Sequence, residues 1–138
     1  MKKHLEIYIF LILLSIFTAA CSSSKIIRTS KSETAASNAK IYKREAEVSY
    51  YADKFNGRKT ANGTTFSNSK LTAAHRTLPF GTKLKVTNIV NSKSVIVEVN
   101  DRGPQKTSRE LDLSKRAFME ITDNKNHGTL KVKIEILK

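Results

Sequence analysis

The feature that most constrains the fold is a series of short segments in which apolar and polar residues alternate. Alternation with period two is typical of strands that bury one face, because successive side chains point to opposite sides. Such segments span residues 47–53, 84–90, 94–101 and 131–137, and the run 111–113 is a further short candidate. The polar residues 88–93 between the second and third segments favour a hairpin connection.

Only one segment of the remaining chain has a credible helical pattern. It spans residues 115–121, and Ser114 before it is a good N-cap residue. One short helix within a run of short strands predicts a mainly β protein with the architecture of a compact barrel.

The N-terminus has the features of a secretory signal. Lys2 and Lys3 precede an apolar run at residues 7–17, and small residues at 18–20 lead into Cys21, the only cysteine. This pattern predicts a lipoprotein signal peptide over residues 1–20, with cleavage before Cys21 and lipid attachment to its thiol. Two alternatives are a transmembrane anchor and a buried helix with an incidental cysteine. Residues 7–21 number only 15, fewer than the roughly 20 that cross a bilayer.

A lipidated Cys21 predicts that the protein is exported and anchored to the cell envelope. Ser22 follows the cysteine, which favours the outer membrane, with the protein facing the periplasm. Residues 21–45 are polar without sustained periodicity and are expected to form a flexible tether. The folded domain is then expected over residues 46–138.

The charge balance is strongly basic, with 25 Lys and Arg against 12 Asp and Glu and a net charge of +13. Export and the lack of clustered Arg and aromatic residues argue against a nucleic-acid partner. Two interpretations remain open, a solvated basic surface and attraction to an anionic wall polymer or to lipid headgroups. One cysteine excludes an intramolecular disulfide and a multi-cysteine zinc site.

Asp101 is the strongest candidate for a catalytic acid. It ends the most apolar strand, and period two places it on the same face as Val95, Val97 and Val99. Partial desolvation on that face favours the neutral, proton-donating form of a carboxyl group. The alternative is a turn residue that caps the Arg-Gly-Pro segment at 102–104.

His75 is a second candidate, before the turn at residues 79–81. A lone histidine in this context is either a structural hydrogen-bonding residue or a participant in catalysis. The other histidines are His4 in the signal segment and His127 in a polar loop, so no metal site is expected. Lipidation would remove the only thiol, which leaves no cysteine nucleophile.

Four sequence runs together resemble the rare lipoprotein A (RlpA) family. They are YYADKFNGRKTANG, LTAAHRTLPFGTKLKVTN, VNDRGP and LDLSKRA, in this order between residues 50 and 117. The resemblance covers about residues 47–138, the whole expected domain. It implies a six-stranded double-psi β-barrel with one short helix, as in expansins.

The resemblance also implies an activity, that of a peptidoglycan lytic transglycosylase. Such an enzyme cleaves the MurNAc–GlcNAc bond, preferably in peptide-poor glycan strands, and leaves 1,6-anhydromuramyl ends. The family's catalytic acid corresponds to Asp101, acting first as acid and then as base, and its motif histidine corresponds to His75, which would orient or polarise. No metal or organic cofactor is implied. Many relatives carry a glycan-binding SPOR domain, which is not expected here because the chain ends at Lys138.

The candidate substrate-binding residues follow from what a glycan groove requires. They are Tyr51, Asn62, Gly63, Thr64, Phe66, Ser67 and Arg102. Family members commonly have Glu and Asp where this chain has Thr64 and Ser67. This departure keeps a second hypothesis open, a non-catalytic peptidoglycan-binding barrel. Among the other carboxylates, Asp112 is interpreted as structural and Glu110 as a surface charge.

Overall fold

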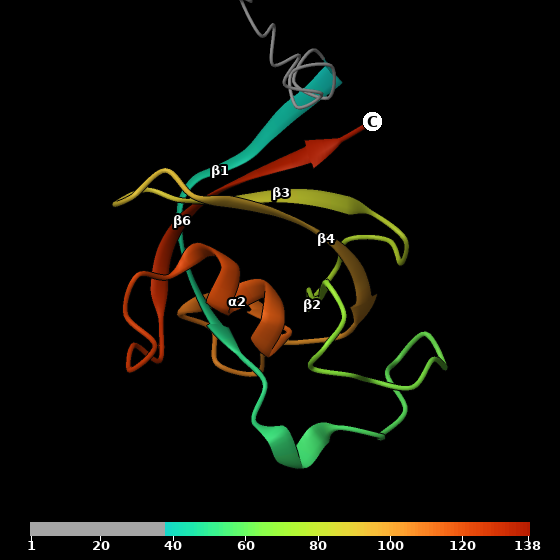
Figure 1. The fold of residues 1–138 in the computed structure, drawn as a ribbon. Helices are drawn as coiled ribbons and strands as arrows, with labels where there is room; N and C mark the ends of the chain where they lie inside the picture. Colours follow the sequence, from blue (N-terminus) through green and yellow to red (C-terminus); the bar gives the residue numbers. More distant parts are fainter. Residues whose placement is uncertain (1–37) are drawn as a thin grey trace, which may run out of the picture. The chain divides into compact units, whose positions relative to one another are not determined.

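The computed structural model describes residues 38–138 (Figure 1). The expected signal peptide at 1–20, Cys21 and most of the expected tether lie outside the described residues. The elements in chain order are β1 (Ala39–Tyr50), the 3-10 helix η2 (Asp53–Phe55), β2 (Thr72–Ala74), β3 (Lys83–Asn88), β4 (Ser94–Asp101), β5 (Arg109–Leu113), α2 (Lys115–Ile121) and β6 (Leu130–Leu137).

The six strands form one closed barrel in the order β1-β5-β2-β4-β3-β6. The pairs β1–β5 and β2–β4 are parallel, and the other pairs are antiparallel. Closure leaves no strand edge unpaired in the ring, which removes the main route to edge-to-edge association. The expected mainly β architecture with six strands and one helix is confirmed.

The element bounds follow the sequence patterns closely in some places and depart in others. The strand expected at 94–101 and the helix expected at 115–121 have those same bounds. Strand β1 begins at Ala39 rather than near residue 46, because its first half pairs with the end of β6, with Ala39 opposite Leu137. The barrel therefore begins earlier in the chain than expected, within the segment that was expected to be tether.

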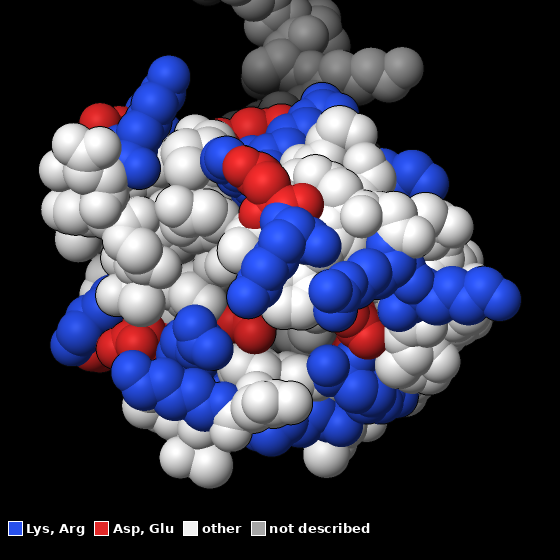
Figure 2. Space-filling model, turned by 90° about the horizontal axis from the view of Figure 1, so that it is seen from below, with Lys and Arg blue, Asp and Glu red and all other residues white. Residues whose placement is uncertain are grey.

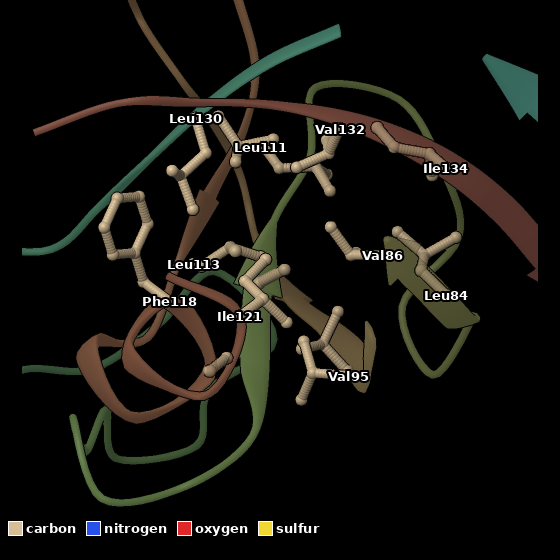
Figure 3. Close-up of a cluster of buried hydrophobic side chains, with 14 of the residues drawn as sticks. Leu84, Val86, Val95, Leu111, Leu113, Phe118, Ile121, Leu130, Val132 and Ile134 are labelled. Atoms are coloured by element: carbon tan, nitrogen blue, oxygen red, sulfur yellow. The ribbon is translucent and has the colours of Figure 1, made fainter. Parts of the chain in front are cut away.

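The barrel interior is filled by the apolar residues that alternate along each strand (Figure 3). Helix α2 contributes Ala117, Phe118 and Ile121 to the same cluster, and all three are fully buried. A packed interior of this kind makes the barrel a rigid support for the loops at its ends. Among residues 38–138, no helix is long and apolar enough to cross a membrane.

One irregularity in the barrel decides where Asp101 points. Ala73 of β2 pairs with Val99, but its neighbour Ala74 pairs with Asp101, so the register shifts by one residue at Asn100. Ala73 and Val99 belong to the buried cluster, and Ala74 and Asp101 do not. A bulge of this type re-aims the side chain that follows it. The expectation that Asp101 shares a face with Val95, Val97 and Val99 is therefore wrong.

Ser114 connects α2 to the barrel and provides a test of this packing. Its hydroxyl accepts from the backbone N–H of Ala117 at the start of the helix and donates to the carbonyl of Lys70 at 2.5 Å. Ser114→Ala should lower the free energy of unfolding by about 1–3 kcal/mol, since the cap and a buried hydrogen bond are both lost. Urea unfolding measures the change. The exposed Ser94→Ala is the control and should change little, and an equal loss in both variants would contradict this account.

Candidate active site

An open cleft of about 630 Å³ lies where the end of β4 meets the segment that follows β1. Residues 50–52, 54, 55, 58, 59 and 66 line the cleft from one part of the chain, and residues 101–105 line it from another. Arg109 and Asp112 of β5 complete the lining. The cleft thus holds two carboxylates, Asp101 and Asp112.

Three hydrogen bonds hold the half-buried carboxylate of Asp101. Its Oδ1 atom accepts from the backbone N–H groups of Ala61 and Arg102, each at 2.8 Å. Its Oδ2 atom accepts from the hydroxyl of Tyr51 at 2.7 Å. Two backbone donors occupy Oδ1, so Oδ2 is the oxygen with capacity left for a ligand. The bond from Arg102 also matches the turn-capping interpretation, and Asp101 serves both purposes at once.

The loop at residues 60–64 brings its backbone to Asp101. Asn62 Oδ1 accepts from the hydroxyl of Thr60, and from the backbone N–H and hydroxyl of Thr64. Gly63 has a backbone φ of +87°, a value that residues other than glycine adopt only at an energetic cost. These local bonds fix a tight turn that aims the N–H of Ala61 at the carboxylate.

The structure divides the expected substrate-binding residues into two groups. Tyr51, Phe66 and Arg102 line the cleft beside Asp101. Asn62, Gly63, Thr64 and Ser67 do not belong to the lining. The side chains of Asn62 and Thr64 bond to each other, and the hydroxyl of Ser67 lies 2.7 Å from that of Ser69.

Tyr51 is an aromatic residue of the cleft whose hydroxyl contacts the Asp101 carboxylate. Its ring packs against those of Phe66 and Phe55, with centroids 4.5 and 5.6 Å away. Burial raises the pKa of Tyr51, and the hydrogen bond to Asp101 raises it further. The hydroxyl is therefore protonated at neutral pH and acts as a permanent donor to Asp101.

Arg102 is held in place by neighbouring groups. Its guanidinium lies 3.8 Å from the centre of the Phe80 ring and donates to the carbonyls of His75 and Leu78. A guanidinium stacked on an aromatic face keeps some of its donors for a ligand. The arrangement therefore fits both interpretations of Arg102, turn stabilisation and contact with an anionic group.

His75 is buried and does not line the cleft. Its Nδ1 atom accepts from the backbone N–H groups of Thr77 and Leu78, at 3.0 and 2.9 Å. The proton is then on Nε2, which donates to Glu110 Oε1 at 3.1 Å. His75 reaches Asp101 through the backbone, where its N–H donates to the Asp101 carbonyl.

Glu110 is buried, so the expectation that it is a surface charge is wrong. Its carboxylate accepts from Lys43 at 2.6 Å, from Arg76 at 3.3 Å and from Tyr42 at 3.2 Å, in addition to His75. These donors supply the charge and hydrogen bonds without which a buried carboxylate is costly.

The same network determines the pKa shifts of His75 and Glu110. Burial lowers the pKa of His75, and this outweighs the opposite effect of Glu110. Burial also raises the pKa of Glu110, but hydrogen bonds from Lys43 and His75 more than compensate, and that pKa lies below its usual range. At neutral pH, therefore, a neutral imidazole donates to an ionised carboxylate.

Basic side chains dominate the surroundings of the cleft. Lys54, Arg58, Lys59, Arg102 and Arg109 belong to its lining, beside Asp101 and Asp112. Figure 2 shows the molecule from below, the side of the 51–67 loops in Figure 1, with Lys and Arg surrounding fewer acidic groups. A cleft rimmed in this way attracts anionic ligands.

Asp112 and Glu110 are the functional candidates that the sequence analysis undervalued. Period two in residues 109–113 places both on the face opposite the buried Leu111 and Leu113, and this signal was available in the sequence. The partners of Glu110 and the Ser49 partner of Asp112 come from distant parts of the chain, which no local pattern indicates.

The comparisons with known proteins agree with this geometry. A family model described as "Lytic transglycolase" matches residues 34–134. A Treponema pallidum protein named "Probable endolytic peptidoglycan transglycosylase RlpA" is 52% identical over 90 residues, which is 65% of this chain and 28% of that protein. A Rickettsia felis protein named "Endolytic peptidoglycan transglycosylase RlpA" is 56% identical over 85 residues, 62% of this chain and 37% of the relative. The matched region is thus about a third of these relatives' length.

Solved structures that are less than 25% identical in sequence to this chain also support the fold. The Streptomyces papain inhibitor superposes with a TM-score of 0.57 at 23% identity, covering 71% of this chain and 97% of the inhibitor. An expansin from Clavibacter michiganensis superposes with a TM-score of 0.55 at 20% identity, covering 69% of this chain and 50% of the expansin. With the fold, the motifs and the family match in agreement, the chain belongs to the lytic transglycolase family and carries an RlpA-type double-psi β-barrel.

Proposed function

We propose that the protein is a peptidoglycan lytic transglycosylase that cleaves the MurNAc–GlcNAc bond and leaves 1,6-anhydromuramyl ends. The observation that carries the proposal is Asp101, held in the cleft with Oδ1 occupied by two backbone donors and Oδ2 turned to Tyr51. The curated relatives with this domain are named as endolytic peptidoglycan transglycosylases.

One carboxyl group is sufficient for both proton transfers of this reaction. Asp101 Oδ2 donates a proton to the leaving GlcNAc oxygen while the bond to the muramyl anomeric carbon breaks. The 6-hydroxyl of the same muramyl residue attacks that carbon and transfers its proton to the Asp101 carboxylate. No second carboxylate is required to activate water, in contrast to inverting hydrolases. The absence of acids at Thr64 and Ser67 is therefore compatible with catalysis.

We assign His75 a positioning role. Its ring locks the turn at residues 75–78, and its backbone N–H holds the carbonyl of Asp101. Carbonyls of the same turn hold Arg102, whose N–H binds Asp101 Oδ1. The imidazole thus acts on the carboxylate through the backbone rather than by proton transfer.

The glycan would lie along the cleft, with Tyr51 and Phe66 as apolar contacts and Arg102 beside the lactyl carboxylate of muramic acid. Peptide-poor strands suit this cleft because their lactyl groups are free carboxylates that basic side chains attract. The remaining candidates would contribute indirectly, through the shape of the loop that holds the Ala61 N–H on Asp101. They are Asn62, Gly63, Thr64 and Ser67.

The N-terminal segment supports an extracytoplasmic location. We propose that residues 1–20 direct export and that Cys21 is lipidated, which anchors the protein to the outer membrane on its periplasmic side. The polar residues that follow Cys21 would allow the barrel to reach the wall.

The first prediction from the proposed function tests the catalytic carboxyl group. Asp101→Asn keeps the size of the side chain and the acceptor for Ala61 and Arg102, but it removes the proton that is exchanged. Turnover of amidase-stripped glycan by the full chain in detergent should fall about 100-fold or more, with cosedimentation with sacculi retained. Anhydromuramyl ends are counted by mass spectrometry.

The control is Asp123→Asn, an exposed carboxylate paired with Lys93 on another loop, which should leave turnover unchanged. Equal turnover by Asp101→Asn and the wild type would refute the assignment of the acid. No product from the wild type, with sacculus binding intact, would favour the non-catalytic peptidoglycan-binding protein.

The second prediction concerns the pH dependence of stability. The pKa of His75 is lower in the folded state than its ordinary value of 6.5, so the unfolded chain binds a proton that the folded chain does not as pH falls through that value. The free energy of unfolding should therefore decrease between about pH 7.5 and about pH 5.5.

His75→Asn removes this titration, and its urea-unfolding free energy should vary less across the same interval. The matched control is His127→Asn in an exposed loop, which should retain the wild-type decrease. A decrease of equal size in His75→Asn and in the wild type would be incompatible with a neutral, buried His75.

The third prediction tests the anchor. Radiolabelled palmitate should be incorporated into the wild-type protein expressed in a bacterial host, and Cys21→Ser should lose the label and leave the membrane fraction. Ser22→Ala serves as the control, because it leaves the thiol intact. A wild-type protein that takes up no label would refute lipidation at Cys21.

A further inference from the structure

The two carboxylates of the cleft are placed symmetrically across one short strand. Strand β2 lies between β4 and β5, and Ala74 of β2 pairs with Asp101 on one side and with Asp112 on the other. Residues paired across neighbouring strands point to the same face of a sheet. Asp101 and Asp112 therefore flank the methyl group of Ala74 and face the same cleft.

The spacing between the two residues suits a sugar ring. Two inter-strand distances separate their Cα atoms, about 9.5 Å in total. Gly103, with a φ of +139°, approaches Ala74 closely, since a Cβ on Gly103 would lie 3.7 Å from the Ala74 methyl. Ala74 is fully buried and does not line the cleft, whereas Gly103, which has no side chain, does.

Only one oxygen of Asp112 is used inside the protein. Its Oδ1 atom accepts from the hydroxyl of Ser49 at 2.6 Å and lies 3.7 Å from Nε of Arg109. Among the described residues, Oδ2 of Asp112 has no hydrogen-bond partner. The carboxylate is thereby oriented by one oxygen and leaves the other available, which is the arrangement expected of a group that contacts a ligand.

Tyr51 connects the two carboxylates electrostatically. Its hydroxyl binds Asp101, and both Asp101 and Asp112 contribute to the raised pKa of Tyr51. Tyr51, Asp101 and Asp112 all line the cleft.

We propose that Asp112 is a second catalytic carboxylate, which contacts the glycan through Oδ2 and stabilises the positive charge that develops on the cleaved muramyl residue. The inference rests on the function proposed above. Asp101 gives its proton to the leaving oxygen and regains one from the attacking 6-hydroxyl, while Asp112 remains ionised throughout. The anomeric carbon loses its bond to the leaving oxygen and gains one to its own 6-oxygen, so no water or other co-reactant is consumed.

This role explains how the chain can catalyse the reaction with Thr64 and Ser67 where family members commonly have carboxylates. A developing oxocarbenium-like charge is stabilised by a preoriented negative group in a partly enclosed site. Asp112 supplies such a group from β5, on the opposite side of Ala74 from Asp101. Thr64 and Ser67 are outside the cleft lining, and acids at those positions would act from the loop rather than from the barrel wall.

The test compares Asp112→Asn with Asp123→Asn in the full chain in detergent, with amidase-stripped glycan as the substrate. Each variant neutralises one carboxylate, but only Asp112→Asn removes a charge from the cleft. Asp112→Asn should lower kcat about 100- to 1000-fold with little change in KM, because the interaction strengthens only in the transition state. Asp123→Asn should retain kcat within about threefold.

Two outcomes would overturn the inference when the wild type is active. One is wild-type turnover by Asp112→Asn. The other is a loss of turnover in Asp112→Asn that is matched by an equal loss of folded protein at the assay temperature, which would make the role of Asp112 structural. Thermal unfolding of both variants separates these results from simple loss of the fold.

A second measurement does not depend on turnover. Carbon-13 NMR of aspartate Cγ atoms should show the Asp112 signal shifting when the same glycan is added, while the Asp123 signal stays in place. If the wild type forms no product, the proposed activity fails. A glycan-dependent shift at Asp112 would then still support a substrate-facing carboxylate, and an unchanged signal would refute it.

Discussion

The register shift between β2 and β4 is the constraint on which the site depends. It allows Val99 to complete the buried interior while Asp101, two residues later, turns into the cleft. An unbroken alternation would have placed Asp101 among the valines, where an ionisable group is costly to bury. The bulge thus separates the part of β4 that stabilises the barrel from the part that performs chemistry.

The surroundings of Asp101 are arranged so that its carboxylate has one geometry. Backbone N–H groups from two different loops hold Oδ1, and the Tyr51 hydroxyl holds Oδ2. In addition, Glu110 binds the His75 ring that fixes the turn at residues 75–78, and carbonyls of this turn hold the Arg102 guanidinium. Preorganisation of this kind places the charge and the donors before the substrate arrives, which is how a small barrel can supply catalysis with few groups.

Much of the fold was predictable from the sequence because its strands and helix have strong local patterns. Strand β4 and helix α2 have the expected bounds, since alternation and an N-cap are local properties. Strand β2 was not predicted, because three small residues have no detectable periodicity. Its position between β4 and β5 depends entirely on pairing with distant strands.

The candidate site was predictable in its residues more than in its geometry. The motifs identified Asp101, Tyr51 and Arg102, and all three line the cleft. The burial of Glu110 was not predictable, because its partners Arg76, His75 and Lys43 are 34, 35 and 67 residues away in the chain. The turn of Asp101 away from the valines was missed for the same reason, since a bulge is a property of the strand pair.

The most direct test of the central claim is a crystal structure of the Asp101→Asn chain with a peptide-free MurNAc–GlcNAc tetrasaccharide. We predict that the sugar occupies the cleft, with the scissile oxygen about 3 Å from the side chain at position 101 and the muramyl ring between positions 101 and 112. A tetrasaccharide bound on another face, or bound in the cleft with its glycosidic oxygens out of reach of position 101, would contradict the account.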